Sequence, residues 1–118
     1  GVDAERFYRV YKMLVEDTMK ALPGIRMILM EPFVLNCGAA ADNWEYFKTE
    51  TALRADAVKT IASECGQLFL PLQKMLCDAC ALAPADYWVG DGVHPTVAGH
   101  KLIADAWMQT FEEKILIK

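Results

Sequence analysis

Three features are scarce in this 118-residue sequence, and each scarcity narrows what the protein can do. Lys and Arg number 12 against 16 Asp and Glu and form no cluster, which excludes the basic patch that nucleic acid or an anionic membrane surface requires. No apolar run approaches the roughly 20 residues that cross a bilayer. Serine occurs once, as Ser63, inside a helical pattern and away from any strand-to-helix turn that would expose a nucleophile. We therefore expect Ser63 to be structural, and neither nucleic acid nor a membrane span to be involved.

The four cysteines do not form a recognisable site. Cys77 and Cys80 have the spacing of redox and zinc motifs, but they lie within a helical pattern, whereas a thioredoxin-like pair opens a helix after a strand. Zinc would need two further ligands, and Cys37 and Cys65 are isolated in the sequence. We expect buried, free thiols in a reducing compartment, which favours a cytoplasmic location, and no metal or other cofactor.

The composition is that of one packed domain covering residues 1–118, with 54% hydrophobic and 24% charged residues. Apolar residues at helical spacing, together with capping and stop signals, predict at least four helices. Their expected ranges are 3–22, ended by Pro23-Gly24; 43–65, ended by Gly66; 71–82; and 96 to about 110.

Two apolar segments of strand length lie between these helices, Ile25–Met30 and Gln67–Leu70. Alternating helices and strands predict a parallel sheet with helices on both faces. Phe33–Asn43 is predicted to be a loop that leaves the carboxyl edge of this sheet, where ligands bind in open α/β folds. We therefore expect this loop beside a functional site.

The most informative stretch is residues 88–100, which places an acid and an imidazole three residues apart. Gly90 and Gly92 flank Asp91 and allow a tight turn, and Pro95 keeps His94 out of the helix that follows. In such a loop the carboxylate can accept a hydrogen bond from one ring nitrogen while the other points outward. This is the acid and base pair of a nucleophilic hydrolase. The alternative is that Asp91 only caps a turn.

The whole string Gly-Asp-Gly-Val-His-Pro-Thr-x-x-Gly-His resembles the last block of the SGNH hydrolases, also called GDSL esterases and lipases. The resemblance implies that Asp91 and His94 complete a Ser-His-Asp triad. It also implies a three-layer α/β/α, flavodoxin-like fold, of which this chain carries the C-terminal part with about two parallel strands. The family's Gly-Asp-Ser block and its oxyanion-hole Gly and Asn are missing from this sequence, so the resemblance places the nucleophile outside this chain.

An ester of a small acyl group or an acetylated carbohydrate is the substrate that the resemblance implies. Four aromatic residues are candidates for the acyl or sugar pocket, although each could instead pack in the core. They are Phe33, Trp44, Tyr87 and Trp88. His100, one residue after Gly99, is interpreted as a packing or surface residue.

Two strands cannot cover their own apolar edge, so we expect a partner there. The partner is either the missing N-terminal half of the fold or another copy of this chain. The competing hypothesis is a non-catalytic interaction module or subunit that keeps the hydrolase fold. The missing nucleophile favours that hypothesis, whereas the presence of both Asp91 and His94 counts against it.

Overall fold

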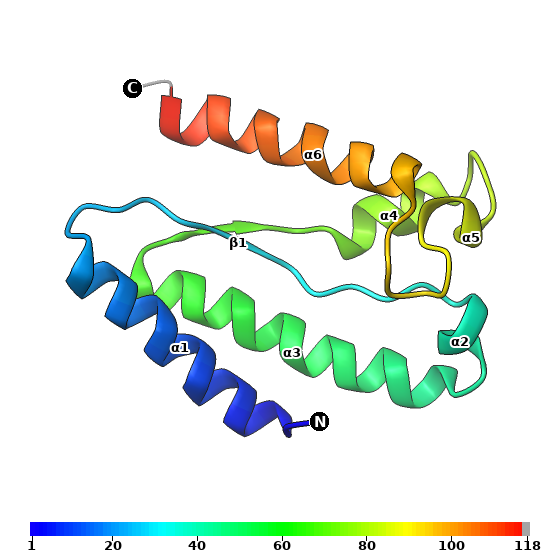
Figure 1. Ribbon diagram of the computed structural model, residues 1–118, viewed down its shortest axis with the longest axis horizontal. Helices are drawn as coiled ribbons and strands as arrows, with labels where there is room; N and C mark the ends of the chain where they lie inside the picture. Colours follow the sequence, from blue (N-terminus) through cyan, green and yellow to red (C-terminus); the bar gives the residue numbers. More distant parts are fainter. Residues whose placement is uncertain (117–118) are drawn as a thin grey trace.

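The computed structural model describes residues 1–116, in which helices alternate with two short strands (Figure 1). The elements are α1 (Ala4–Ala21), β1 (Ile28–Met30), α2 (Gly38–Ala41), α3 (Trp44–Cys65), β2 (Leu68–Leu70), α4 (Gln73–Ala79), α5 (Ala85–Trp88), α6 (Val97–Phe111) and the π-helical turn η1 (Glu112–Leu116). No helix within residues 1–116 is long and apolar enough to cross a membrane.

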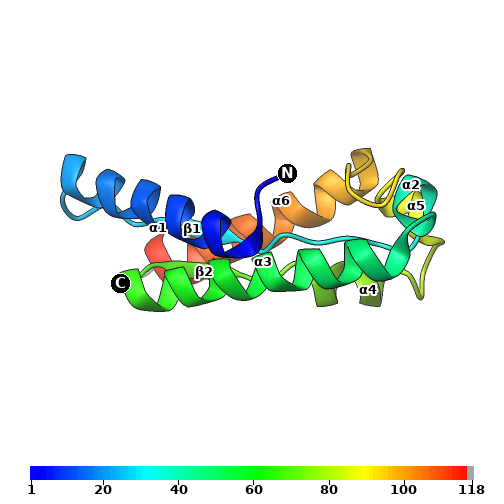
Figure 2. The same cartoon turned by 90° about the horizontal axis from the view of Figure 1, so that it is seen from below.

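The two strands pair in parallel and are covered by helices on both sides, as the alternating pattern predicted. Ile28 lies opposite Leu68 and Met30 opposite Leu70. Helix α3 contacts both strands, and α1 packs beside α3, whereas α6 lies on the other side of the strands (Figures 1 and 2). The three-layer α/β/α prediction is therefore confirmed.

Three of the predicted helix signals act where the sequence places them, whereas the expected cap of α3, Asp42 or Asn43, makes no side-chain capping bond. The Asp3 carboxylate accepts a hydrogen bond from the Arg6 N–H at 2.8 Å and begins α1. Gly66 follows α3 in the left-handed conformation, with φ of 65°, which explains the stop. The Thr96 hydroxyl accepts from the Gly99 N–H at 3.2 Å and begins α6.

Other boundaries differ from those predicted. The third helix was expected over 71–82 but covers only Gln73–Ala79, because the Glu31 side chain accepts hydrogen bonds from Leu72 N–H and Gln73 N–H and sets its start. Tighter turns of i to i+3 type replace the helix after Ala79. The strands are also shorter than expected. Two four-residue helices, α2 and α5, occupy stretches predicted to be irregular.

Two apolar clusters support the two ends of the molecule. The first joins α1, β1 and α3 through the buried side chains of Val15, Leu29, Val58, Ile61 and Ala62. The second lies under the loop that follows α5 and consists of Leu35, Leu76 and Val89, of which Leu76 and Val89 are fully buried. The second cluster gives the Asp91–His94 loop a rigid base.

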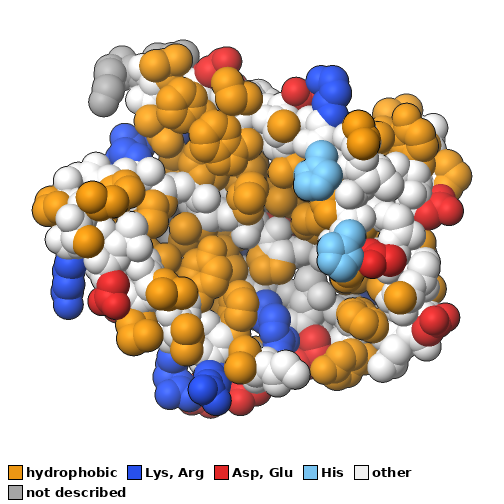
Figure 3. All heavy atoms as spheres, viewed as in Figure 1, with side chains coloured by type: hydrophobic (Ala, Val, Ile, Leu, Met, Phe, Trp, Pro, Cys, Tyr) orange, Lys and Arg blue, Asp and Glu red, His pale blue; other side chains and the backbone are white. Residues whose placement is uncertain are grey.

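One edge of β1 is open. Leu68 N–H donates to the Met27 carbonyl and Glu31 N–H donates to the Leu70 carbonyl. Because parallel strands direct alternate residues to opposite edges, Ile28 and Met30 turn their main-chain groups away from β2. Within residues 1–116 the sheet has no strand on that side. Figure 3 shows a broad apolar area on this face of the molecule, between α6 and α1.

Candidate active site

The loop from Val89 to Pro95 is closed by its own main chain. Val89 and Pro95 form an isolated antiparallel bridge, and the Gly90 N–H donates to the His94 carbonyl at 3.1 Å. Gly92 has a φ of +96°, so the predicted need for glycine is confirmed there, whereas Gly90 is not in the left-handed region. The closed loop gives the residues between its ends a defined geometry.

Asp91 and His94 are in direct contact in this loop. One Asp91 oxygen, Oδ1, accepts hydrogen bonds from Val93 N–H at 2.9 Å and His94 N–H at 2.8 Å. The other, Oδ2, lies 2.7 Å from His94 Nδ1. The His94 ring, followed by the two amides, holds the pKa of Asp91 well below its usual range. The predicted Asp91–His94 contact is present, and the carboxylate is ionised at neutral pH.

The imidazole is directed outward. The His94 side chain is 83% exposed and that of Asp91 43%. Within residues 1–116 the ring makes its hydrogen bond through Nδ1, which leaves Nε2 accessible. Both histidine side chains of the chain are visible on the face that carries the open edge of β1 (Figure 3). A group arriving from that side could therefore reach the free nitrogen of His94.

The segment that follows β1 holds the loop at the carboxyl end of the strands. Leu35 N–H donates to the Gly92 carbonyl at 2.9 Å, and Ala40 N–H donates to the Asp91 carbonyl at 3.1 Å. The Cys37 thiol, whose pKa is raised by burial and by Asp86, donates to the Val89 carbonyl at 3.0 Å. The expectation that residues 33–43 lie beside the Asp91–His94 loop is thus confirmed, although the sequence indicated none of these bonds.

Hydrogen bonds of Thr96 hold the C-terminal end of the loop. Besides capping α6, its hydroxyl donates to the Tyr87 carbonyl at 2.6 Å and lies 3.2 Å from the Trp88 carbonyl. A Cβ at Gly99 would collide with the Trp88 carbonyl. The helix and the loop are therefore in main-chain contact, which leaves little freedom for the segment that carries His94.

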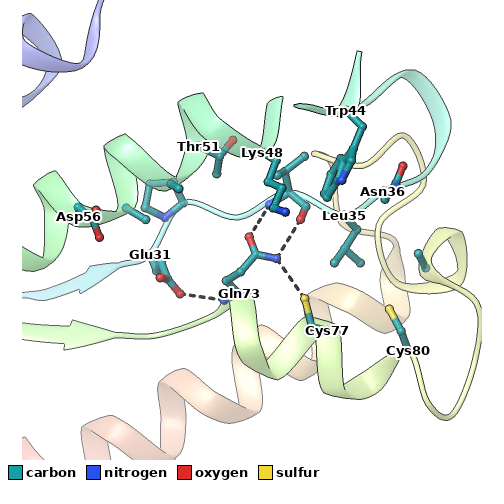
Figure 4. Close-up of a pocket in the computed structure, with 15 residues that line it drawn as sticks. Glu31, Leu35, Asn36, Trp44, Lys48, Thr51, Asp56, Gln73, Cys77 and Cys80 are labelled. Atoms are coloured by element: carbon teal, nitrogen blue, oxygen red, sulfur yellow. Dashed lines mark hydrogen bonds between the residues drawn. The ribbon is translucent and has the colours of Figure 1, made fainter. Parts of the chain in front are cut away.

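Trp44, one of the four pocket candidates, lines a cavity of about 540 Å³ between α3 and α4 (Figure 4). Two of the polar side chains there serve the fold: Gln73 bonds both main-chain groups of Val34, and Glu31 caps α4. Asp91 and His94 are not among the residues lining this cavity.

The other three candidates lie elsewhere. Phe33 packs against the second apolar cluster. Tyr87 and Trp88 contact each other edge to face and line a second cavity, of about 840 Å³, beside the start of α6. The Trp88 indole N–H donates to the Ala79 carbonyl at 3.0 Å. Trp88 thus has a structural role whatever else it does, and Tyr87 is exposed.

The remaining predicted features lie away from the pair. Ser63 is on the last turns of α3, at the opposite end of that helix from the Asp91–His94 loop (Figure 1). All four cysteines of the described chain are free thiols. The expectation that they are buried was wrong: Cys37, Cys65 and Cys80 are half-buried, and Cys77 is exposed because it lines the open cavity between α3 and α4. Residues 1–116 hold no cluster of three or more potential metal ligands.

Several solved structures share this arrangement. A protein of Parabacteroides merdae assigned to the GDSL-like lipases matches with a TM-score of 0.86 and 31% identity, over 95% of this chain and 51% of that one. The acetylxylan esterase Axe2 of Geobacillus stearothermophilus matches with a TM-score of 0.70 and 28% identity, over 90% of this chain and 46% of that one. LAE5, an α/β hydrolase from the Lake Arreo metagenome in Spain, shares the fold with a TM-score of 0.77 at 21% identity, over 94% of this chain and 48% of that one.

The chain shares the α/β fold of these hydrolase structures. Residues 1–102 match the model of the GDSL-like lipase/acylhydrolase family, and the chain belongs to that family. It spans about half the length of the solved structures it matches. No curated protein sequence matches this chain.

Proposed function

We propose that this chain supplies the acid and base half of a serine ester hydrolase. The observation that carries the proposal is the 2.7 Å contact between Asp91 Oδ2 and His94 Nδ1, in a ring that is otherwise exposed. The contact assigns the ring proton to Nδ1, because the carboxylate can only accept. Nε2 is then the basic nitrogen, and it faces away from Asp91.

In the proposed reaction His94 first acts as a general base. Nε2 takes the proton of a serine hydroxyl as the serine oxygen attacks the ester carbonyl, and it returns that proton to the departing alcohol. Asp91 stabilises the imidazolium and keeps the ring in one orientation. Water then repeats the sequence on the acyl-enzyme and releases the acid. The serine and the oxyanion donors come from outside this chain.

We infer that the missing part of the hydrolase domain adds to β1. The free main-chain groups of Ile28 and Met30 offer an edge for a further strand, and the apolar face beside them needs cover. Half-length coverage of the solved structures supports this arrangement. Because the His94 ring opens on the same side as that edge, strands added there would bring a serine from the side that Nε2 faces.

The proposed substrate is an ester of a small acyl group or an acetylated carbohydrate. The likeness to an acetylxylan esterase at 28% identity supports this substrate class. Phe33, Trp44, Tyr87 and Trp88 are the proposed pocket residues, since aromatic faces suit acyl chains and sugar rings. Their separate locations mean that residues outside this chain would have to join them into one pocket.

The test is hydrolysis of a chromogenic acetate ester by the hydrolase that contains this chain, with and without His94→Ala. We expect His94→Ala to abolish turnover. His100→Ala is the matched control, because it removes the chain's other histidine from the same face and should leave turnover within a small factor. Full activity of His94→Ala would contradict the proposal, and an enzyme inactive in both forms would favour the interaction module.

A further inference from the structure

Gly38 and Asp91 meet main chain to main chain, although they are far apart in sequence. Gly38 has a φ of +53°, and a Cβ there would lie 2.6 Å from the Asp91 Cα and 3.0 Å from the Gly90 carbonyl oxygen. Distances below 3.0 Å require the neighbouring atoms to move, and these atoms belong to the backbone. Only a residue without a side chain leaves Asp91 where it is.

A second glycine, Gly92, lies in the same contact between the two segments and belongs to the Asp91–His94 loop. A Cβ at Gly92 would collide with the Ala40 side chain and would lie 2.7 Å from the Leu35 carbonyl oxygen. Ala40 N–H and Leu35 N–H donate to the carbonyls of Asp91 and Gly92. Figures 1 and 2 both show α2 beside this loop. Two glycines, one on each segment, thus allow the two main chains to touch and to hydrogen bond.

We infer that Gly38 is a positioning residue for the Asp91–His94 pair. It lets α2 approach close enough for Ala40 N–H to hold the Asp91 carbonyl, and this fixes the Cα from which the carboxylate reaches His94 Nδ1. The ring itself is 83% exposed, so the carboxylate is its main restraint. The catalytic meaning of this role rests on the proposed function, but the contact can be measured without any substrate.

A side chain at position 38 should change the state of the His94 ring. Moving Asp91 lengthens the 2.7 Å contact, and a neutral ring without that bond distributes its proton between Nδ1 and Nε2. The experiment is ¹⁵N and ¹H NMR of the His94 ring in the full 118-residue chain with Gly38→Ala. We expect the wild-type ring to be protonated at Nδ1 and the variant to lose this preference and the downfield Nδ1 proton signal.

Gly38→Asn makes the test robust against misfolding. Asparagine tolerates positive φ better than alanine and still carries the offending Cβ, so it should shift the ring signals in the same way. Gly66→Asn and Gly66→Ala are the matched controls. Gly66 has a φ of +65°, but a Cβ there would meet nothing within 4 Å among the described residues. These controls carry the same backbone strain and should leave the His94 ring unchanged.

The result that would overturn the inference is a folded Gly38→Asn chain, with dispersed amide signals, whose His94 nitrogens match the wild type. An equal shift in the Gly66 variants would also overturn it, since strain alone would then be the cause. If His94 proves irrelevant to hydrolysis, the proposed function fails and the contact stands. If the His94 ring signals are unchanged in the Gly38 variants, only the positioning role of Gly38 is contradicted.

Discussion

The Asp91–His94 loop and the open edge of β1 lie on one face of the molecule and differ in how far their polar groups are satisfied. In the loop, the Asp91 carboxylate and carbonyl and the Gly92 carbonyl all have partners within this chain. At the edge, the main-chain groups of Ile28 and Met30 point away from β2, and the side chain of Met30 is 45% exposed. The hydrogen bonds of the Asp91–His94 loop are complete within the described chain, whereas those of the sheet are not.

The loop and the sheet edge therefore depend on different parts of the protein. The loop closes on itself and is held by the segment after β1, so every partner it needs lies within this chain. A parallel sheet with two strands leaves apolar surface that only another segment or another chain can cover. Changes at the loop should therefore affect chemistry, and changes at the edge should affect assembly.

The largest expected effect is on chemistry. In the proposed hydrolase, His94→Ala should lower kcat by a factor on the order of 10⁶, because the general base of a triad is lost. Asp91→Asn should lower it by roughly 10⁴, because the ring is held in the wrong tautomer. The measurement is steady-state hydrolysis of a chromogenic acetate. An Asp91→Asn enzyme as active as the wild type would remove Asp91 from the triad.

By itself, the chain should have no serine-esterase activity, since the proposed function takes the serine from outside it. It carries the proposed acid and base, but its one serine, Ser63, lies at the far end of α3, and the proposed oxyanion donors come from outside it. The same assay on the purified chain should show no turnover above the background rate, and adding the N-terminal half, if the two associate, should restore it. Robust activity of the lone chain that survives His94→Ala would locate the chemistry elsewhere.

The next largest expected effect is on the oligomeric state. The lone chain should form dimers or larger species, because its apolar face and strand edge are uncovered. Met30→Lys places a charge on that edge and should shift the population toward the monomer of 13.2 kDa in sedimentation. The His94 ring signals should not change, which would show that edge and loop are independent. A wild-type chain that sediments as a monomer would mean that the edge is protected.

Thr96 links the loop to α6, and removing its hydroxyl should have a moderate effect. Thr96→Ala loses the cap on Gly99 N–H and the bond to the Tyr87 carbonyl, so the free energy of unfolding should fall by about 1 kcal/mol. Urea denaturation measures this loss. Thr96→Ser keeps the hydroxyl and is the control, which should retain most of the stability. Equal stability of the Ala and Ser variants would contradict this role of the hydroxyl.

The smallest effect is on the pH dependence of stability. The folded pKa of Asp91 is lowered, so its contribution is fully present above the pKa of an unfolded aspartate, about 4, and is lost as the pH falls through the folded pKa. The stability difference between wild type and Asp91→Asn should therefore narrow in acid. A ¹³C titration of the Asp91 carboxyl checks the cause, and a pKa at or above the ordinary value would contradict it.

Sequence reasoning predicted local features well. Asp3, Gly66 and Thr96 act at the helix ends where their types and positions suggested, and Asp91 meets His94 as the three-residue spacing in a constrained loop predicted. The order of helices and strands was sufficient to predict a parallel sheet. Each of these features depends on residues close in the chain or on the periodicity of one segment.

Features that depend on distant residues escaped prediction. The start of α4 is set by Glu31, roughly forty positions earlier, and α2 was missed because a short alanine-rich turn has no periodicity to detect. The sequence carried one signal of the contact between Gly38 and Asp91. Gly38 precedes three alanines in a segment expected beside the site. The four aromatic candidates share a residue type but do not share a cavity in this chain.

The sequence by itself therefore determined the Asp91–His94 contact and the parallel sheet, because short-range spacing and hydrophobic periodicity encode them. The family was indicated by the resemblance of the string from Gly90 to His100. Only the tertiary structure decided how the pair is held. The segment after β1 reaches Asp91 and Gly92 by main-chain hydrogen bonds, which are made by groups that every residue has and which leave no mark on side-chain types. The position of Asp91 depends on where two backbones can approach, and that is a property of the folded chain.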